Sequence, residues 1–302
     1  MKTCCLRPWN PRCWIMLIGA FLVIGSPHPG TAEEGLPKSL SNSLSFAATF
    51  DRDFNADFSK GDGRLYSSKT IDRKQIDQSL TAPGVARVRL GARSGEALKF
   101  TKSDPRFLFF KANKNLNYQS DRAWSGSVSY FMKLDPEKDL PDNFVDPLQI
   151  TEKDWNDAAF WNDFTKDDRP RKFRLGVLAD LKVWNPGNKD FDKMPDSEKP
   201  AVVVLNPPFR SDRWTHILIT FEDFNTGQTN GNCSLYIDGQ LQGKLTGRNQ
   251  KFSWDPDKAV IFLGINYAGL MDDLMIFDRT LTSDEAAILA RFRHDNQPMI
   301  HP

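Results

Sequence analysis

The sequence predicts an all-β fold, a two-sheet antiparallel β-sandwich with one short C-terminal helix. The 22 Phe, 19 Gly and 19 Pro among 302 residues favour strands and tight turns. Short segments of alternating apolar and polar residues recur along the chain with turn residues between them, which is typical of a sandwich. No long helical periodicity appears before the end of the chain.

The predicted strands are short and follow one another through most of the chain. Asp238-Gly239 separates two of them and predicts a two-residue hairpin, because both positions tolerate positive φ. The expected strands are 44–50, 87–90, 97–101, 106–111, 126–134, 173–181, 201–205, 214–221, 233–237, 240–245, 259–265 and 270–277.

One helix is expected near the C-terminal end. Thr282 can cap it, Glu285 completes a capping box three residues later, and residues 286–290 are apolar. We expect its apolar stripe to pack on the sandwich.

The N-terminal segment is typical of a secretory signal peptide. Lys2, Arg7 and Arg12 give a basic start, the run 14–25 is apolar, and helix breakers follow. Cleavage is expected after Ala32, and an uncleaved N-terminal anchor is the alternative. The apolar run is shorter than the roughly 20 residues that span a bilayer.

The remaining organisation follows from composition. We predict a disordered leader over 33–43, one domain over 44–295 with a long loop-rich insertion around 135–212, and a tail over 296–302. After signal cleavage no transmembrane segment is expected, and the location would be secreted, periplasmic or at the cell envelope.

Cysteine content and charge narrow the class further. Cys233 is the single cysteine after residue 32, so it is expected to be a small core residue without a disulfide, and a secreted chain without disulfides favours a bacterial source. Without the three basic residues of the signal, 37 Lys and Arg face 39 Asp and Glu. This near-neutral balance indicates that nucleic acid is not the partner.

Several motifs carry a family resemblance when they are taken in order. They are Phe50-Asp51-Arg52, Arg213-Trp214-Thr215-His216-Ile217, Leu235-Tyr236-Ile237-Asp238-Gly239, Phe262-Leu263-Gly264, Gly269-Leu270-Met271-Asp272-Asp273-Leu274, and Phe277-Asp278-Arg279-Thr280-Leu281-Thr282. Over residues 44 to about 292 the chain resembles the laminin G-like jelly-roll domains of the concanavalin A-like lectin/glucanase superfamily. The resemblance implies a jelly roll with a concave face edged by variable loops, often with a Ca²⁺ ion. We expect Trp214 at the centre of the sandwich and His216 as an ordinary strand residue.

A structural Ca²⁺ site is the first candidate site. Calcium takes six to eight oxygen ligands, and the first and last strands of this fold are commonly neighbours. Asp51 and Asp272 are therefore the expected ligands, with Asp273 or Asp53 next. The alternative is that Asp51 and Asp272 cap turns and pair with Arg279 or Arg52.

A glycan-binding site in the insertion is the second candidate, and it makes a glycan or cell-surface ligand the expected partner. Aromatic faces can stack on sugar rings while nearby carboxylates accept hydrogen bonds from hydroxyl groups. The alternative is that the tryptophans hold a long insertion onto the sheet. The predicted ligand-binding residues are Trp155, Trp161, Trp184, Asp154, Asp157 and Asp180, with Asp163 close by.

These observations predict a secreted lectin-like binding module and not an enzyme. A glycoside hydrolase of the same superfamily is one alternative, but its Glu-x-Asp-x-x-Glu motif is incomplete in both places where it almost occurs. Glu137-Lys138-Asp139 ends at Asp142, and Glu152-Lys153-Asp154 ends at Asp157. A protein–protein adhesion module is the other alternative.

Overall fold

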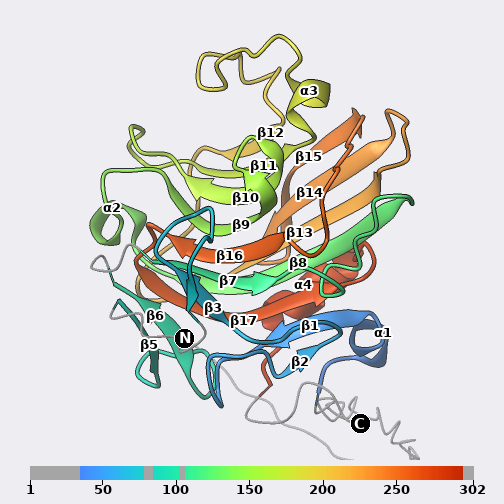
Figure 1. Cartoon of the computed structure of the whole chain (residues 1–302). Helices are drawn as coiled ribbons and strands as arrows, with labels where there is room; N and C mark the ends of the chain where they lie inside the picture. The colour runs from blue at the N-terminus through green and yellow to red at the C-terminus, as the bar shows by residue number, and fades with distance from the viewer. Residues whose placement is uncertain (1–34, 78–83, 102–105, 295–302) are drawn as a thin grey trace, which may run out of the picture. The chain divides into compact units, whose positions relative to one another are not determined.

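The computed structural model describes residues 35–77, 84–101 and 106–294, which fold into two antiparallel sheets packed as a sandwich (Figure 1). The predicted all-β fold is therefore confirmed. Four short helices accompany the sheets in the described residues: α1 (Lys38–Ser41), α2 (Pro136–Asp139), α3 (Leu181–Trp184) and α4 (Ser283–Arg291). The predicted signal peptide and the 296–302 tail lie outside the described residues.

The first sheet brings strands from both ends of the chain together. β1 pairs with β17 along its length, and β6 with its partner β5 extends the other part of the same β17 edge. The strand order is β15 (Gln240–Arg248), β14 (Gly231–Ile237), β13 (Thr215–Phe224), β8 (Trp124–Lys133), β17 (Gly269–Phe277), β1 (Leu44–Ala48) and β2 (Phe58–Ser59), with β6 (Ala97–Phe100) and β5 (Val85–Val88) at the side.

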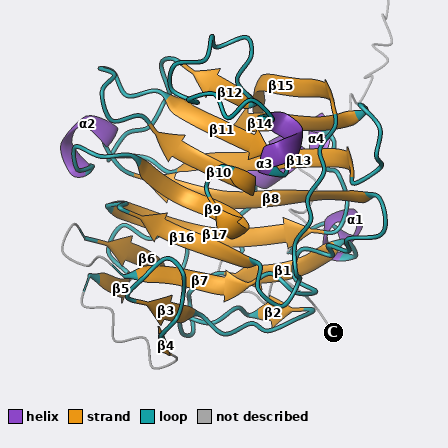
Figure 2. Cartoon of the chain, turned by 45° about the horizontal axis from the view of Figure 1, so that its top comes forward, coloured by secondary structure: helices purple, strands orange, loops and turns teal. Residues whose placement is uncertain are grey.

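The second sheet contains the four strands that the predicted insertion forms (Figure 2). Its order is β12 (Ala201–Val204), β11 (Phe173–Leu178), β10 (Asp157–Phe164), β9 (Val145–Asp154), β16 (Val260–Ile265), β7 (Phe107–Lys111), β3 (Tyr66–Ser68) and β4 (Ile76–Asp77). Within the insertion, β11 and β12 fall where strands were predicted, whereas β9 and β10 were not predicted. Pro147 obscured β9 in the sequence, and it is tolerated because the β9–β10 register shifts beside it.

The core between the sheets is aromatic at its centre. Trp124 is 2% exposed and stacks on Phe160 at a centroid distance of 5.5 Å, with Phe221 at 4.7 Å. The expectation that Trp214 fills this place is wrong. Trp214 precedes β13, is only half-buried, and donates its indole N–H to the Gly91 carbonyl at 3.1 Å.

The hairpin and helix predictions are confirmed. Asp238 and Gly239 join β14 to β15 with φ of 50° and 75°. A Cβ on Gly239 would lie 2.9 Å from Cα of Ala287, so this turn packs closely on α4. Helix α4 has the full Thr282–Glu285 capping box.

The segment before β1 is folded, so the prediction of a disordered leader is wrong from residue 35 onward. Leu36 and Leu40 are buried in a cluster with Leu44 and Leu289 on the outer side of the first sheet. The polar composition concealed two leucines whose burial stabilises this segment.

His216 and Cys233 are both buried strand residues, as expected. Burial lowers the pKa of His216 to about 3, and its Nε2 lies 2.9 Å from the Ser129 hydroxyl. Burial likewise raises the pKa of the Cys233 thiol, so the thiol is held in its unreactive form.

Candidate functional site

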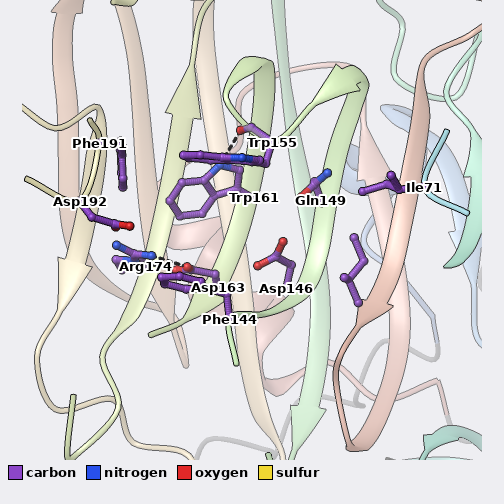
Figure 3. A pocket seen from close by; sticks show the side chains of 11 residues that line it. Ile71, Phe144, Asp146, Gln149, Trp155, Trp161, Asp163, Arg174, Phe191 and Asp192 are labelled. Atoms are coloured by element: carbon purple, nitrogen blue, oxygen red, sulfur yellow. Dashed lines mark hydrogen bonds and ion pairs between the residues drawn. The ribbon is translucent and has the colours of Figure 1, made fainter. Parts of the chain in front are cut away.

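A pocket opens on the outer face of the second sheet, and its cavity volume is about 660 Å³ including the mouth. Figure 3 shows the side chains around it. Its lining comprises Ile71, Phe144, Asp146, Gln149, Trp155, Trp161, Asp163, Arg174, Phe191, Asp192 and Ile265.

Strand alternation places these side chains outside the core. Leu148 and Ile150 of β9 point into the sandwich, so Gln149 between them faces outward. The pairing of β9 with β10 sets Trp161 opposite Gln149. On the other side of β10, Asp163 lies opposite Arg174 of β11.

Three tryptophans surround Phe191, which belongs to the loop after α3. The ring centroids of Trp155, Trp161 and Trp184 lie 5.7, 5.9 and 6.2 Å from that of Phe191. The tryptophans therefore hold the insertion onto the sheet, which was the alternative predicted from the sequence. Trp184 lies outside the lining and donates its indole N–H to the Asn156 carbonyl at 2.8 Å, whereas Trp155 and Trp161 also line the pocket.

Trp155 and Trp161 differ in exposure and in their position in the pocket. Trp161 is buried and donates its indole N–H to the Trp155 carbonyl at 3.0 Å. Trp155 lies in the β9–β10 turn with 40% of its surface exposed. The Trp161 ring therefore forms a fixed wall of the pocket, and the Trp155 ring is exposed at its mouth.

The charged groups of the pocket are paired unevenly. Arg174 donates to both oxygens of Asp163, and its guanidinium lies 5.4 Å from the Trp161 ring centroid. Burial raises the pKa of Asp163, and the Arg174 pair opposes that shift. Burial, followed by the charge of Asp163, raises the pKa of Asp146 well above its usual range.

The predicted carboxylates Asp154, Asp157 and Asp180 lie outside the pocket lining. Asp154 accepts from the Trp155 N–H at 2.7 Å, and Asp157 accepts from the Leu181 N–H at 2.8 Å. Asp180 accepts from both the N–H and the hydroxyl of Ser253. These three hold the β9–β10 turn and α3 in place.

Sequence reasoning missed Asp146, Gln149, Arg174 and Phe191 as lining residues. The only signal for Gln149 was a polar residue between two apolar ones, and assigning its partner requires the β9–β10 register.

The near misses to the hydrolase motif also lie outside the lining. Glu137 lies in α2 and its carboxylate accepts a hydrogen bond from the Arg171 N–H, while the Glu152 carboxylate accepts one from the Asp255 N–H.

Three of the four predicted calcium ligands come together. Asp51, Asp272 and Asp273 gather where β17 passes the segment after β1, as expected, whereas Asp53 is exposed and accepts from the Asn55 N–H. The alternative partners Arg279 and Arg52 are not used here: Arg279 pairs with Glu285.

Cationic side chains face this carboxylate cluster. Nη1 of Arg93 lies 2.6 Å from Asp273, and the imidazole of His294 lies 3.0 Å from Asp273 and 3.6 Å from Asp51. Calcium requires six to eight oxygens, and in the described part of the chain no group of three or more His, Cys, Asp or Glu is arranged to hold a metal. Arg93 and His294 would therefore compete with Ca²⁺ for these carboxylates, and calcium binding stays a prediction.

Residues 181–287 match the family model described as "Concanavalin A-like lectin/glucanases superfamily". The resemblance found in the sequence is confirmed by this match. No curated protein is significantly similar to the chain.

Solved structures with the same fold share little sequence with this chain. Domain 4 of AbnA, an extracellular GH43 arabinanase from Geobacillus stearothermophilus in complex with arabinotriose, is 17% identical with a TM-score of 0.52, covering 82% of this chain and 98% of that one. The binding domain of botulinum neurotoxin serotype D is 14% identical (TM-score 0.51, 83% and 52%), and that of neurotoxin DC in complex with rat synaptotagmin II is 12% identical (0.54, 83% and 52%). The chain spans about half of these neurotoxin domains. At such identities the likeness shows the jelly-roll fold alone.

No helix within the described ranges has the length and apolar character needed to cross a membrane.

Proposed function

We propose that this chain is an exported, non-catalytic module that binds carbohydrate in the pocket of the second sheet. The observation that carries the proposal is the combination of an exposed Trp155 ring, a fixed Trp161 wall and polar groups between them. Ligand sites are mostly apolar with a few placed polar groups, and this pocket has that character. The arabinotriose complex of the arabinanase domain supports the proposal by analogy.

The export part of the proposal rests on the N-terminal sequence pattern, with the periplasm, cell envelope or exterior as the destination. Cell fractionation of the full chain, with N-terminal sequencing of the product, tests it. Recovery of an uncleaved chain in the cytoplasm would contradict export without affecting the binding proposal.

A glycan array tests the binding part. Trp155→Ala removes the exposed ring, and we expect at least a tenfold loss of affinity for every glycan that the wild type binds. Leu241→Ala is the matched control, because Leu241 is also exposed, at 47%, but lies on β15 of the first sheet. Equal binding by wild type and Trp155→Ala would contradict the proposed site.

Glycoside hydrolysis is the second candidate, because two carboxyl groups of raised pKa, Asp146 and Asp163, share the pocket. Such pairs perform acid–base or nucleophilic steps in glycosidases. Asp163 is held by Arg174, which leaves Asp146 as the less constrained carboxyl, and binding without cleavage is therefore favoured. Release of reducing ends from a bound glycan, abolished by Asp146→Asn, would establish catalysis instead.

A further inference from the structure

We infer that the pocket selects uncharged sugars over acidic ones, and that the Gln149 carboxamide supplies the hydrogen bonds that read their hydroxyl groups. This inference rests on the proposed function and names the class of ligand within it.

Gln149 is the first observation. Its side chain is 1% exposed, and Nε2 has no hydrogen-bond partner among the residues that the structure describes. Buried polar groups are almost always paired, so an unpaired donor at the edge of a cavity calls for a ligand or an ordered water. In Figure 3 this carboxamide lies between Trp161 and Ile71 and faces the cavity.

The position of Gln149 suits a sugar ring. Because Trp161 is its direct neighbour across the β9–β10 pair, a ring stacked against the tryptophan wall brings its hydroxyl groups to the carboxamide. An amide both donates and accepts, as a hydroxyl group does. Asp146 adds a second polar group to the same side of the cavity, and its raised pKa favours a neutral carboxyl that can also donate.

The charges of the lining are the second observation. Arg174 is the one basic residue of the described lining, and its Nε and Nη2 donate to the two oxygens of Asp163 in a bidentate ion pair. With Asp146 neutral, the carboxylates of Asp163 and Asp192 still outnumber the one guanidinium, which interacts with both. A carboxylate or sulfate on the ligand would therefore meet an excess of negative charge, so anionic sugars should be rejected.

The neighbouring recess does not change this charge balance. It shares Phe144, Arg174 and Asp192 with the pocket and adds several lysines. Lys172 lies 2.9 Å from Asp168, Lys199 lies 2.9 Å from Asp196, and Lys166 lies 3.7 Å from Asp167. These cations are already neutralised by neighbouring carboxylates.

Paired oligosaccharides test the inference. Cellotriose and β-1,4-glucuronotriose, or β-1,4-mannotriose and β-1,4-mannuronotriose, share linkage and differ in a C6 hydroxymethyl or carboxylate. On an array that contains such pairs and sialylated glycans, we expect every bound glycan to be neutral, with acidic counterparts at least tenfold weaker. Equal or tighter binding of the acidic members would overturn the inference while leaving carbohydrate binding intact. Failure of the wild type to bind any glycan would overturn the proposed function and this inference with it.

Two variants test Gln149 directly. Gln149→Glu keeps the shape and adds a negative charge, and Gln149→Met removes the hydrogen-bonding groups at similar volume. Both should weaken the neutral glycan at least tenfold, with melting temperatures confirming that each variant folds. Gln242→Glu, an exposed position on β15, is the matched control and should bind as the wild type does. Wild-type affinity in a folded Gln149 variant would overturn its assigned role.

Discussion

Gly176 of β11 supports the Trp161 wall, and replacing it with alanine tests how tightly the pocket is built. The residue lies opposite Trp161 in the β10–β11 pair. A Cβ at this position would lie 2.2 Å from Cζ2 of the indole, whereas ordinary contacts begin near 3.4 Å. The ring would therefore have to move by about 1.2 Å.

The indole has little room for such a movement. Its N–H donates to the Trp155 carbonyl at 3.0 Å, the Phe191 ring lies at 5.9 Å, and the Arg174 guanidinium lies at 5.4 Å. Overpacking of this kind costs about 1–3 kcal/mol. For a chain of this size that corresponds to a fall in melting temperature of roughly 2–5 °C. The displaced ring should also weaken glycan binding, because it is part of the pocket wall.

Urea unfolding followed by tryptophan fluorescence, together with glycan titration, measures both effects of Gly176→Ala. Gly187→Ala is the matched control, since a Cβ there meets nothing within 4 Å. A Gly176→Ala variant with wild-type stability and affinity would show that Trp161 is free to move, and the description of a fixed wall would be wrong.

Three further predictions concern the buried charges. Burial depresses the pKa of His216 to about 3, so native-state stability is greatest above the ordinary pKa of 6.5 and falls as pH is lowered. The loss of unfolding free energy at pH 5 should be about 2 kcal/mol in urea titrations. It should be absent in His216→Leu. For His294, burial disfavours the imidazolium, but contact with Asp273 and the charges of Asp273 and Asp51 raise the pKa. The contribution of His294 to native-state stability is therefore present below pH 6.5 and lost as pH rises through the folded-state pKa. His294→Gln should remove that loss of stability at higher pH. Because Arg93 and His294 face the carboxylates near Asp51, excess Ca²⁺ and excess chelator should give the same melting temperature, and a rise of several degrees with Ca²⁺ would instead support the sequence prediction of a calcium site.

The fold was largely predictable because alternation and turn chemistry are local. The Asp238-Gly239 turn and the Thr282–Glu285 cap each depend on residues within a few positions, and both formed as expected. The central tryptophan was not predictable in the same way. Trp124 begins β8 and Trp214 directly precedes β13, and which of them is enclosed depends on the facing sheet, where Phe160 covers Trp124.

The candidate site was predictable at two of its aromatic residues and at Asp163. Trp155 and Trp161 were expected to bind ligand because of their residue type, and both line the pocket. Asp154 and Asp157 are close to Trp155 in sequence, but the β9–β10 turn engages them locally. Gln149 and Asp146 reach the pocket through strand register, which a single sequence does not reveal.

The position of the pocket follows from how the two outer faces of the sandwich are covered. On the first sheet, Leu218, Met275 and Phe277 point away from the core and are buried by Leu40 of α1 and Leu289 of α4. On the second sheet, the loop after α3 places Phe191 over one part of the outer face, and the segment after β3 places Ile71 and Arg73 over another part, where Phe262 is buried. The same insertion that buries Trp161 therefore forms a wall of the cavity beside it. The packing of the tryptophans and the presence of a cavity are thus two consequences of one structural feature, and this is why Trp155 and Trp161 both contact Phe191 and line the pocket.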